Sequence, residues 1–215
     1  MSTQLRSCIK PYVLFIVLVL LFSGAKAQHT GYLGLHGGWG SAQGKELKLG
    51  SGICLDLELP LGEKVLLNFR PSLNRRSFNY GGLSPMVEKA TYFDIPVTLI
   101  FLKEDQDDLG FYGGFGAYYG MALSGKVKRY DNSGNLSWSA MKFGEKATDD
   151  RVRTDFGAVL DFGVRFGEGK RTAKVGLQIM HGIKDIAPAE LQNNPTASIS
   201  RRLRNYTFYV AVALF

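Results

Sequence analysis

Charged side chains stand at alternate positions within apolar segments of this chain, where they could form ion pairs away from water. Asp56 and Glu58 alternate with leucines, and Arg70 occupies a polar position in the next apolar segment. A charge that is buried has to pair with an opposite charge or give up its ionisation. We therefore expect Arg70 to meet Asp56, Glu58 or Asp161. The predicted charge network comprises Asp56, Glu58, Arg70, Asp94, Asp161 and Arg165, with Asp155 and Lys174 on the same face.

Histidine, serine and cysteine offer little further chemistry. A hydrolase needs a nucleophile and a base at the same level of the fold, and the one conceivable pair joins His181 to Ser198 or Ser200. After residue 27 the only cysteine is Cys54, and no group of residues has the spacing of metal ligands. We expect no catalytic residue, no cofactor and no metal.

Most of the chain has the two-residue periodicity of β-strands. Between residues 53 and 59, for example, apolar side chains alternate with Cys54, Asp56 and Glu58, and such alternation is typical of strands with one apolar face. Eight segments share the pattern, which predicts an all-β fold of eight antiparallel strands. The segments are 32–40, 53–59, 65–74, 92–101, 109–123, 155–166, 173–179 and 206–215.

The first 27 residues have the features of a signal peptide. A basic start precedes the apolar run 12–22, and Ala25-Lys26-Ala27 has the small-x-small form that signal peptidase accepts. A membrane anchor is the alternative, but a helical crossing needs about 20 apolar residues, and this run has 11. We expect residues 1–27 to be removed and residues 28–215 to form one domain.

The connections between the predicted strands alternate in length. Short links near 62–63, 103–108 and 167–171 follow the second, fourth and sixth strands, while longer links, up to 125–150, follow the others. Outer-membrane barrels have short periplasmic turns, long external loops and an even number of strands. The order of lengths predicts an eight-stranded antiparallel up-and-down transmembrane β-barrel.

The two faces of the strands help to separate a membrane barrel from a soluble one. A soluble ligand-binding barrel also alternates but turns its apolar face inward. Here the polar face is rich in glycine beside Asp, Arg and Glu, which suits a narrow interior. We expect the apolar face to meet lipid, with the soluble barrel as the alternative. Aromatic residues near both ends of the apolar face resemble membrane girdles: Trp39, Phe101, Phe111, Phe156 and Phe166.

Several motifs resemble a known family. The segments 92–97, 111–116 and 155–157, together with the terminal strand, are similar to the porin-family outer-membrane β-barrel domain that is abundant in Bacteroidetes-type bacteria. The resemblance implies the fold and an integral location in the bacterial outer membrane, and it transfers no catalytic residue. Phe215, the last residue, also resembles the signal read by the barrel-insertion machinery.

Basic residues concentrate in the predicted external loops and their margins, which hold 16 bases and eight acids. Lysine and arginine form charge-assisted pairs with the phosphates of lipopolysaccharide, and nucleic acid is not an expected partner in this location. Outer-membrane lipid and lipopolysaccharide are the expected partners. The residues expected to contact lipopolysaccharide are Arg75, Arg76, Arg201, Arg202 and Arg204.

The charge network predicts a closed lumen, because the interior of an eight-stranded barrel is just wide enough to be filled by its side chains. The favoured function is a non-enzymatic integral barrel with a role in envelope structure, surface interaction or limited passage of small solutes. One alternative is the barrel component of a protein secretion or assembly machine, with an unidentified protein partner. Another is an outer-membrane lipid-modifying enzyme.

Overall fold

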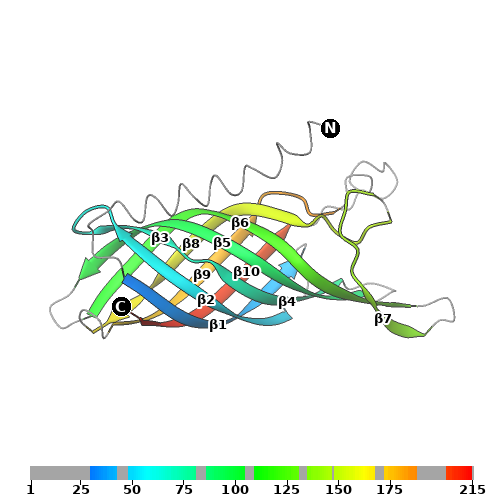
Figure 1. The fold of residues 1–215 in the computed structure, drawn as a ribbon, viewed down its shortest axis with the longest axis horizontal. Helices are drawn as coiled ribbons and strands as arrows, with labels where there is room; N and C mark the ends of the chain where they lie inside the picture. Colours follow the sequence, from blue (N-terminus) through cyan, green and yellow to red (C-terminus); the bar gives the residue numbers. More distant parts are fainter. Residues whose placement is uncertain are drawn as a thin grey trace, which may run out of the picture.

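The computed structural model describes residues 30–42, 48–80, 86–104, 109–130, 135–146, 148–167, 172–187 and 202–214. Among them, no helix has the length and apolar character that a membrane crossing requires. The regular structure is a single ten-stranded sheet (Figure 1). Its strands are β1 (Thr30–Ala42), β2 (Lys48–Pro60), β3 (Val65–Phe69), β4 (Ser72–Tyr80), β5 (Met86–Glu104), β6 (Leu109–Tyr130), β7 (Leu136–Ala140), β8 (Thr154–Phe166), β9 (Ala173–Gly182) and β10 (Leu203–Ala213).

The sheet closes on itself. β1 pairs with both β2 and β10, and the pairing of β5 with β6 completes the ring. β3 and β4 share one position in it, because both pair with β2 on one side and β5 on the other. β7 lies outside the ring and pairs with the outer part of β6. All pairs are antiparallel, which confirms the predicted eight-stranded up-and-down barrel.

The position shared by β3 and β4 is interrupted at Arg70 and Pro71. Pro96 of β5 lies opposite this break and accepts a 3.1 Å hydrogen bond from the backbone N–H of Arg70 through its carbonyl oxygen. The sequence predicts a bulge or local edge at Pro96, because proline has no N–H to donate to the ladder. The register shift between β5 and β6 falls instead at Thr91 and Tyr92, and the irregularity near Pro96 lies in the neighbouring strand.

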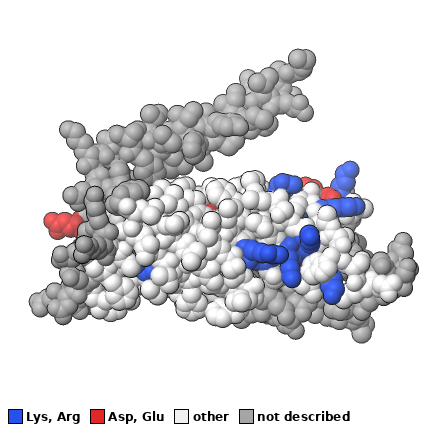
Figure 2. All heavy atoms as spheres, turned by 60° about the horizontal axis from the view of Figure 1, so that its bottom comes forward, with Lys and Arg blue, Asp and Glu red and all other residues white. Residues whose placement is uncertain are grey.

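The alternation of residues places apolar side chains outside and polar ones inside. In β8, Phe156, Leu160 and Phe162 are exposed, while Asp155 and Asp161 are buried in the lumen. Figure 2 shows an uncharged band on the face it presents, with Lys and Arg gathered toward the end that carries β7. An apolar exterior around a polar interior is the arrangement of transmembrane barrels and the inverse of a soluble barrel. The chain is thus a transmembrane β-barrel.

The sequence leaves open which face of the last strand meets lipid, and the structure settles this point. In β10, Phe208, Val210 and Val212 are exposed on the outer surface. Tyr209 and Ala211, which alternate with them, are buried inside the barrel. The final ten residues are apolar on both faces of the strand in the sequence, so only the pairing with β1 and β9 decides which face meets lipid.

Two strands are longer than a membrane crossing requires. β5 has 19 residues and β6 has 22, whereas a transmembrane strand needs about 9–11. Their outer parts, 86–91 and 123–130, extend beyond the barrel wall at the end where the long connections lie (Figure 1). Together with the paired residues of β4 and β7 they form an antiparallel ribbon. The sequence assigns 125–150 to an external loop, but 125–130 continue β6.

Candidate functional site

A central ion-pair cluster around Arg70 fills the middle of the lumen. Its Nη1 lies 2.8 Å from Oδ2 of Asp161, and its Nη2 lies 3.0 Å from Oδ2 of Asp56. Nη2 also donates a 2.9 Å hydrogen bond to the hydroxyl of Tyr209, which in turn donates one of 2.8 Å to Asp161. All four residues are buried. The cluster satisfies the pairing that buried charges require.

Lys174 of β9 joins the cluster to the turn end of the lumen. Its Nζ lies 3.0 Å from Oδ2 of Asp56 and also pairs with Glu58. The ammonium group stands over the ring of Tyr32, 4.1 Å from the ring centre. Arg165 lies farther from Glu58, at 3.7 Å, and is partly exposed. The network therefore spans several strands and has two cations beside Glu58.

A second cluster lies nearer the outer end. Arg76 pairs with Asp94, which also accepts a hydrogen bond from Asn74. On the neighbouring strands β6 and β8, the hydroxyl of Tyr118 donates a 2.6 Å hydrogen bond to Asp155. Both carboxylates are buried, so this level of the lumen is filled as well.

The outer mouth of the barrel is covered by residues from two connections. Arg151, which is fully buried, pairs with Glu88 and donates a 2.9 Å hydrogen bond to the hydroxyl of Tyr92. Its guanidinium lies 4.6 Å from the centre of the Phe78 ring. An apolar cluster packs at the same level and includes Met141 from one connection and Ile186 from another: Phe78, Ala90, Tyr92, Ala122, Met141, Ile186 and Leu203.

The free volume beside Arg70, in the middle of the lumen, is small. The cavity beside Arg70 and His36 measures about 10 Å³, which is about the space that one water molecule needs. Among the described residues, no group of three or more His, Cys, Asp or Glu side chains could hold a metal ion. The charged side chains of the interior compensate one another, and together they pack the core of the barrel.

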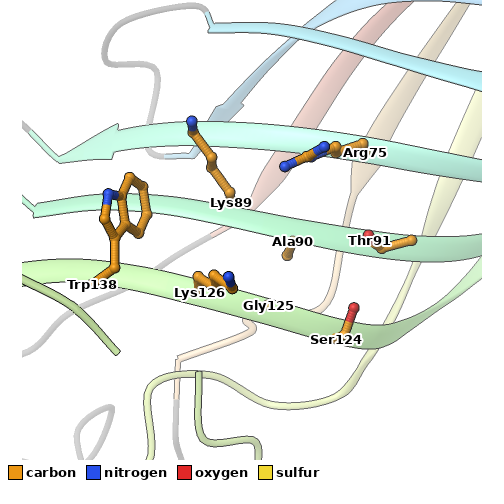
Figure 3. A pocket seen from close by; sticks show the side chains of 8 residues that line it. All are labelled: Arg75, Lys89, Ala90, Thr91, Ser124, Gly125, Lys126 and Trp138. Atoms are coloured by element: carbon orange, nitrogen blue, oxygen red, sulfur yellow. The ribbon is translucent and has the colours of Figure 1, made fainter. Parts of the chain in front are cut away.

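A groove of about 430 Å³ opens on the outer surface of the ribbon (Figure 3). Three cationic side chains, Arg75, Lys89 and Lys126, come from three different strands and border it together with the indole of Trp138. The hydroxyl-bearing side chains of Thr91 and Ser124 line its other end. The groove is thus basic and polar, unlike the apolar barrel wall next to it.

The residues predicted to contact lipopolysaccharide do not all lie on the outer surface of the barrel. Arg75, Arg202 and Arg204 are exposed, as a contact with lipid headgroups requires. Arg76 does not fit the prediction: it is 3% exposed and pairs with Asp94 inside the barrel. The reason is that neighbouring residues of a strand point to opposite faces, so Arg75 and Arg76 cannot both face lipid. Arg201 lies outside the described residues.

The predicted lumen residues all lie inside the barrel, and three further charged residues join them. Arg76 of β4 and Glu88 of β5 lie at the alternate positions whose side chains are buried in these strands. Strict alternation along each strand would therefore have predicted that both side chains face the lumen. Arg151 lies in a connection without strand periodicity, so the sequence pattern does not predict that its side chain is buried. His181 is exposed on β9, and Ser198 and Ser200, the nucleophiles considered beside it, lie outside the described part of the chain.

No protein-family model and no curated protein matches the chain. Solved structures similar to it include Ail, the attachment invasion locus protein of Yersinia pestis, with 10% identity over 88% of this chain and 100% of that one, and a TM-score of 0.47. Neisserial surface protein A has 13% identity over 86% and 96%, with a TM-score of 0.47. Outer membrane protein OprG of Pseudomonas aeruginosa has 11% identity over 87% and 95%, with a TM-score of 0.42. At these scores the barrel assignment rests on the strand pairings themselves.

Proposed function

We propose that this chain is a non-enzymatic integral barrel of the bacterial outer membrane that acts through its external surface and conducts no solute. The observation that carries the proposal is a lumen filled by paired charges inside an apolar outer wall. Arg70, Asp56 and Asp161 occupy the centre of the barrel, where an open channel would need water.

Several features of the chain support a location in the outer membrane. Residues 1–27 are expected to direct export. Exposed aromatic side chains near both ends of the wall match the girdles at the two membrane interfaces. At the turn end, Phe101 stacks with Phe115 at 6.1 Å between ring centres, and near the outer end Trp39 contacts Phe208 edge-on at 5.7 Å. The motifs at 92–97 and 111–116 support membership of the porin-family outer-membrane domain.

Surface interaction is the role favoured among those that the sequence left open. The outer mouth is covered by apolar packing, which opposes passage of small solutes, while the ribbon formed by β4 to β7 presents a basic surface to the outside. Lipopolysaccharide is the proposed partner of the exposed Arg75, Arg202 and Arg204, because their charges complement its phosphates. The barrel-insertion machinery is the proposed partner during biogenesis.

Two measurements on the full chain test this proposal. First, outer-membrane fractions are run on a denaturing gel with and without boiling, and we expect the unboiled protein to migrate faster as a folded barrel. Second, the purified barrel is reconstituted in planar bilayers beside an open 16-stranded porin. We expect the porin to conduct and this protein to show no stable conductance. Recovery in the soluble fraction, or stable channel openings, would overturn the proposal.

A further inference from the structure

The basic groove brings like charges together across neighbouring strands. Lys89 of β5 stands directly opposite Lys126 of β6 in the register, and both are exposed. Arg75 of β4 is paired with Thr91, two residues along β5 from Lys89 and on the same face. Like charges placed directly opposite each other are destabilising in a sheet. The arrangement therefore favours an anion between them.

The described residues do not supply that anion. None of Arg75, Lys89 and Lys126 has a carboxylate of the described chain within the 4.0 Å of an ion pair. Glu88, which neighbours Lys89 in sequence, points into the lumen and pairs with Arg151. The ring of Trp138 stands beside Lys89, with its centre 5.1 Å from Nζ. The three cations are thus available to a ligand from outside.

An apolar groove lies on the same outer wall, next to a depression that borders the basic groove. The depression measures about 170 Å³ and shares Arg75 and Lys89 with the basic groove. Its residues Ser51 and Arg75 each lie two positions along the strand from Ile53 and Leu73 of the apolar groove. Beyond it lies a groove of about 250 Å³ where the break at Pro71 interrupts the strand. Most of the side chains that line it are apolar: Leu33, Ile53, Leu55, Leu73 and Phe93. Arg75 follows Leu73 by two residues on the same face, so cationic and apolar surfaces adjoin.

We propose that this strip binds a phosphorylated lipid of the outer leaflet. The phosphate lies between Arg75, Lys89 and Lys126, which can form charge-assisted hydrogen bonds with it, and an acyl chain lies in the groove beside Pro71. The indole of Trp138 covers the headgroup from the side of β7. The inference rests on the proposed location in the outer membrane and deepens it, because it names the lipid class and its binding residues. It adds Lys89, Lys126 and Trp138 to the expected contacts.

Trp138 offers a direct readout, because the chain has two tryptophans. In the variant Trp39→Phe, the fluorescence of the folded, membrane-extracted barrel reports on Trp138 alone. Diphosphorylated lipid A is titrated into zwitterionic detergent, with phosphatidylcholine and inorganic phosphate as comparators. We expect a saturable change with lipid A at concentrations where phosphatidylcholine gives none. Inorganic phosphate should compete only at concentrations at least about 100-fold higher, because it lacks the chain that fills the apolar groove.

Paired variants separate this site from general charge attraction. Lys89→Gln with Lys126→Gln should weaken lipid A binding at least about tenfold, since each charge-assisted contact is lost. The matched control is Lys64→Gln with Lys103→Gln, which removes the same charge from exposed lysines at the turn end and should leave binding unchanged.

Three outcomes would overturn the inference: an equal response to phosphatidylcholine, equally strong binding of inorganic phosphate, or equal weakening by the control pair. None of them would alter the unboiled mobility of the barrel or its lack of conductance. The failure of this inference is therefore distinguishable from the failure of the proposed function. All variants are first shown to keep the fast unboiled mobility.

Discussion

Arg70 and Asp161 stand three positions apart in the eight-position ring of strands, yet Nη1 of the arginine lies 2.8 Å from Oδ2 of the aspartate. The pair crosses the lumen and connects walls that share no backbone hydrogen bonds. Because Asp56 pairs with the same guanidinium, one arginine compensates two buried carboxylates. The interior of this barrel is therefore held together by charge pairs where a soluble protein has an apolar core.

Removing the central guanidinium should destabilise the barrel strongly. Arg70→Gln leaves Asp56 and Asp161 facing each other without their shared cation, and breaking one side of a buried ion pair costs about 3–5 kcal/mol. We expect a matching loss in the free energy of unfolding, measured by urea titration in detergent. Arg75→Gln, which changes an exposed arginine of the adjoining strand, should shift the free energy by less than about 0.5 kcal/mol.

A second substitution tests whether the loss comes from the unpaired carboxylate. Asp161→Asn combined with Arg70→Gln removes the carboxylate that loses its cation, whereas Asp56 keeps its ion pair with Lys174. The double variant should be more stable than Arg70→Gln alone, which is the non-additivity that contacting residues show. Strictly additive losses would mean that the 2.8 Å contact between the two side chains contributes no coupling.

Gly176 should be intolerant of even a methyl group. A Cβ at this position would lie 2.5 Å from the hydroxyl oxygen of Tyr112 and 2.6 Å from that of Tyr209. Both tyrosines are buried and hydrogen-bonded to each other, so Gly176→Ala should cost about 1–3 kcal/mol through overpacking. The temperature at which the fast-migrating band converts to the slow one should fall. Gly113→Ala is the control, because its Cβ would meet Phe162 at an ordinary 3.7 Å.

Labelling with a membrane-impermeant maleimide should distinguish the two neighbouring arginines on intact cells. In a Cys54→Ala background, Arg75→Cys should react because that position is exposed, whereas Arg76→Cys should not, since it lies inside the lumen. Lys64→Cys in the short turn should react only after the outer membrane is permeabilised. Reaction at position 64 on intact cells would reverse the orientation assigned to the barrel.

Arg151 should hold the long connection over the barrel mouth. Arg151→Gln removes the ion pair with Glu88 and the contact with Phe78, so the segment around Met141 loses its anchor at the mouth. We expect faster cleavage of this connection in limited proteolysis of the folded barrel. Arg153→Gln is the matched control, because that side chain is exposed and only stacks on Phe143. Equal cleavage of both variants would contradict an anchoring role.

Alternation in the sequence was sufficient to predict the barrel and most of its interior. Asp56, Arg70 and Asp161 were identified because strand residues two apart share a face. The same rule, applied without exception, would have placed Arg76 inside. The prediction for Arg76 is wrong because Arg75 and Arg76 adjoin a predicted loop, where side chains do not alternate between two faces. The position of β6 beyond residue 123 was missed for a similar reason, since its apolar residues give way to lysines.

The sequence by itself determined which side chains share a face and how many strands must close the ring, because both follow from the two-residue period of the chain. Only the tertiary structure decided which of those side chains meet. Strand tilt and register bring Arg70 to Asp161 and Lys174 to Asp56 across the lumen, and no local pattern encodes such distances. The same register places Lys89 opposite Lys126 on the outside, where the ligand we propose compensates their charge.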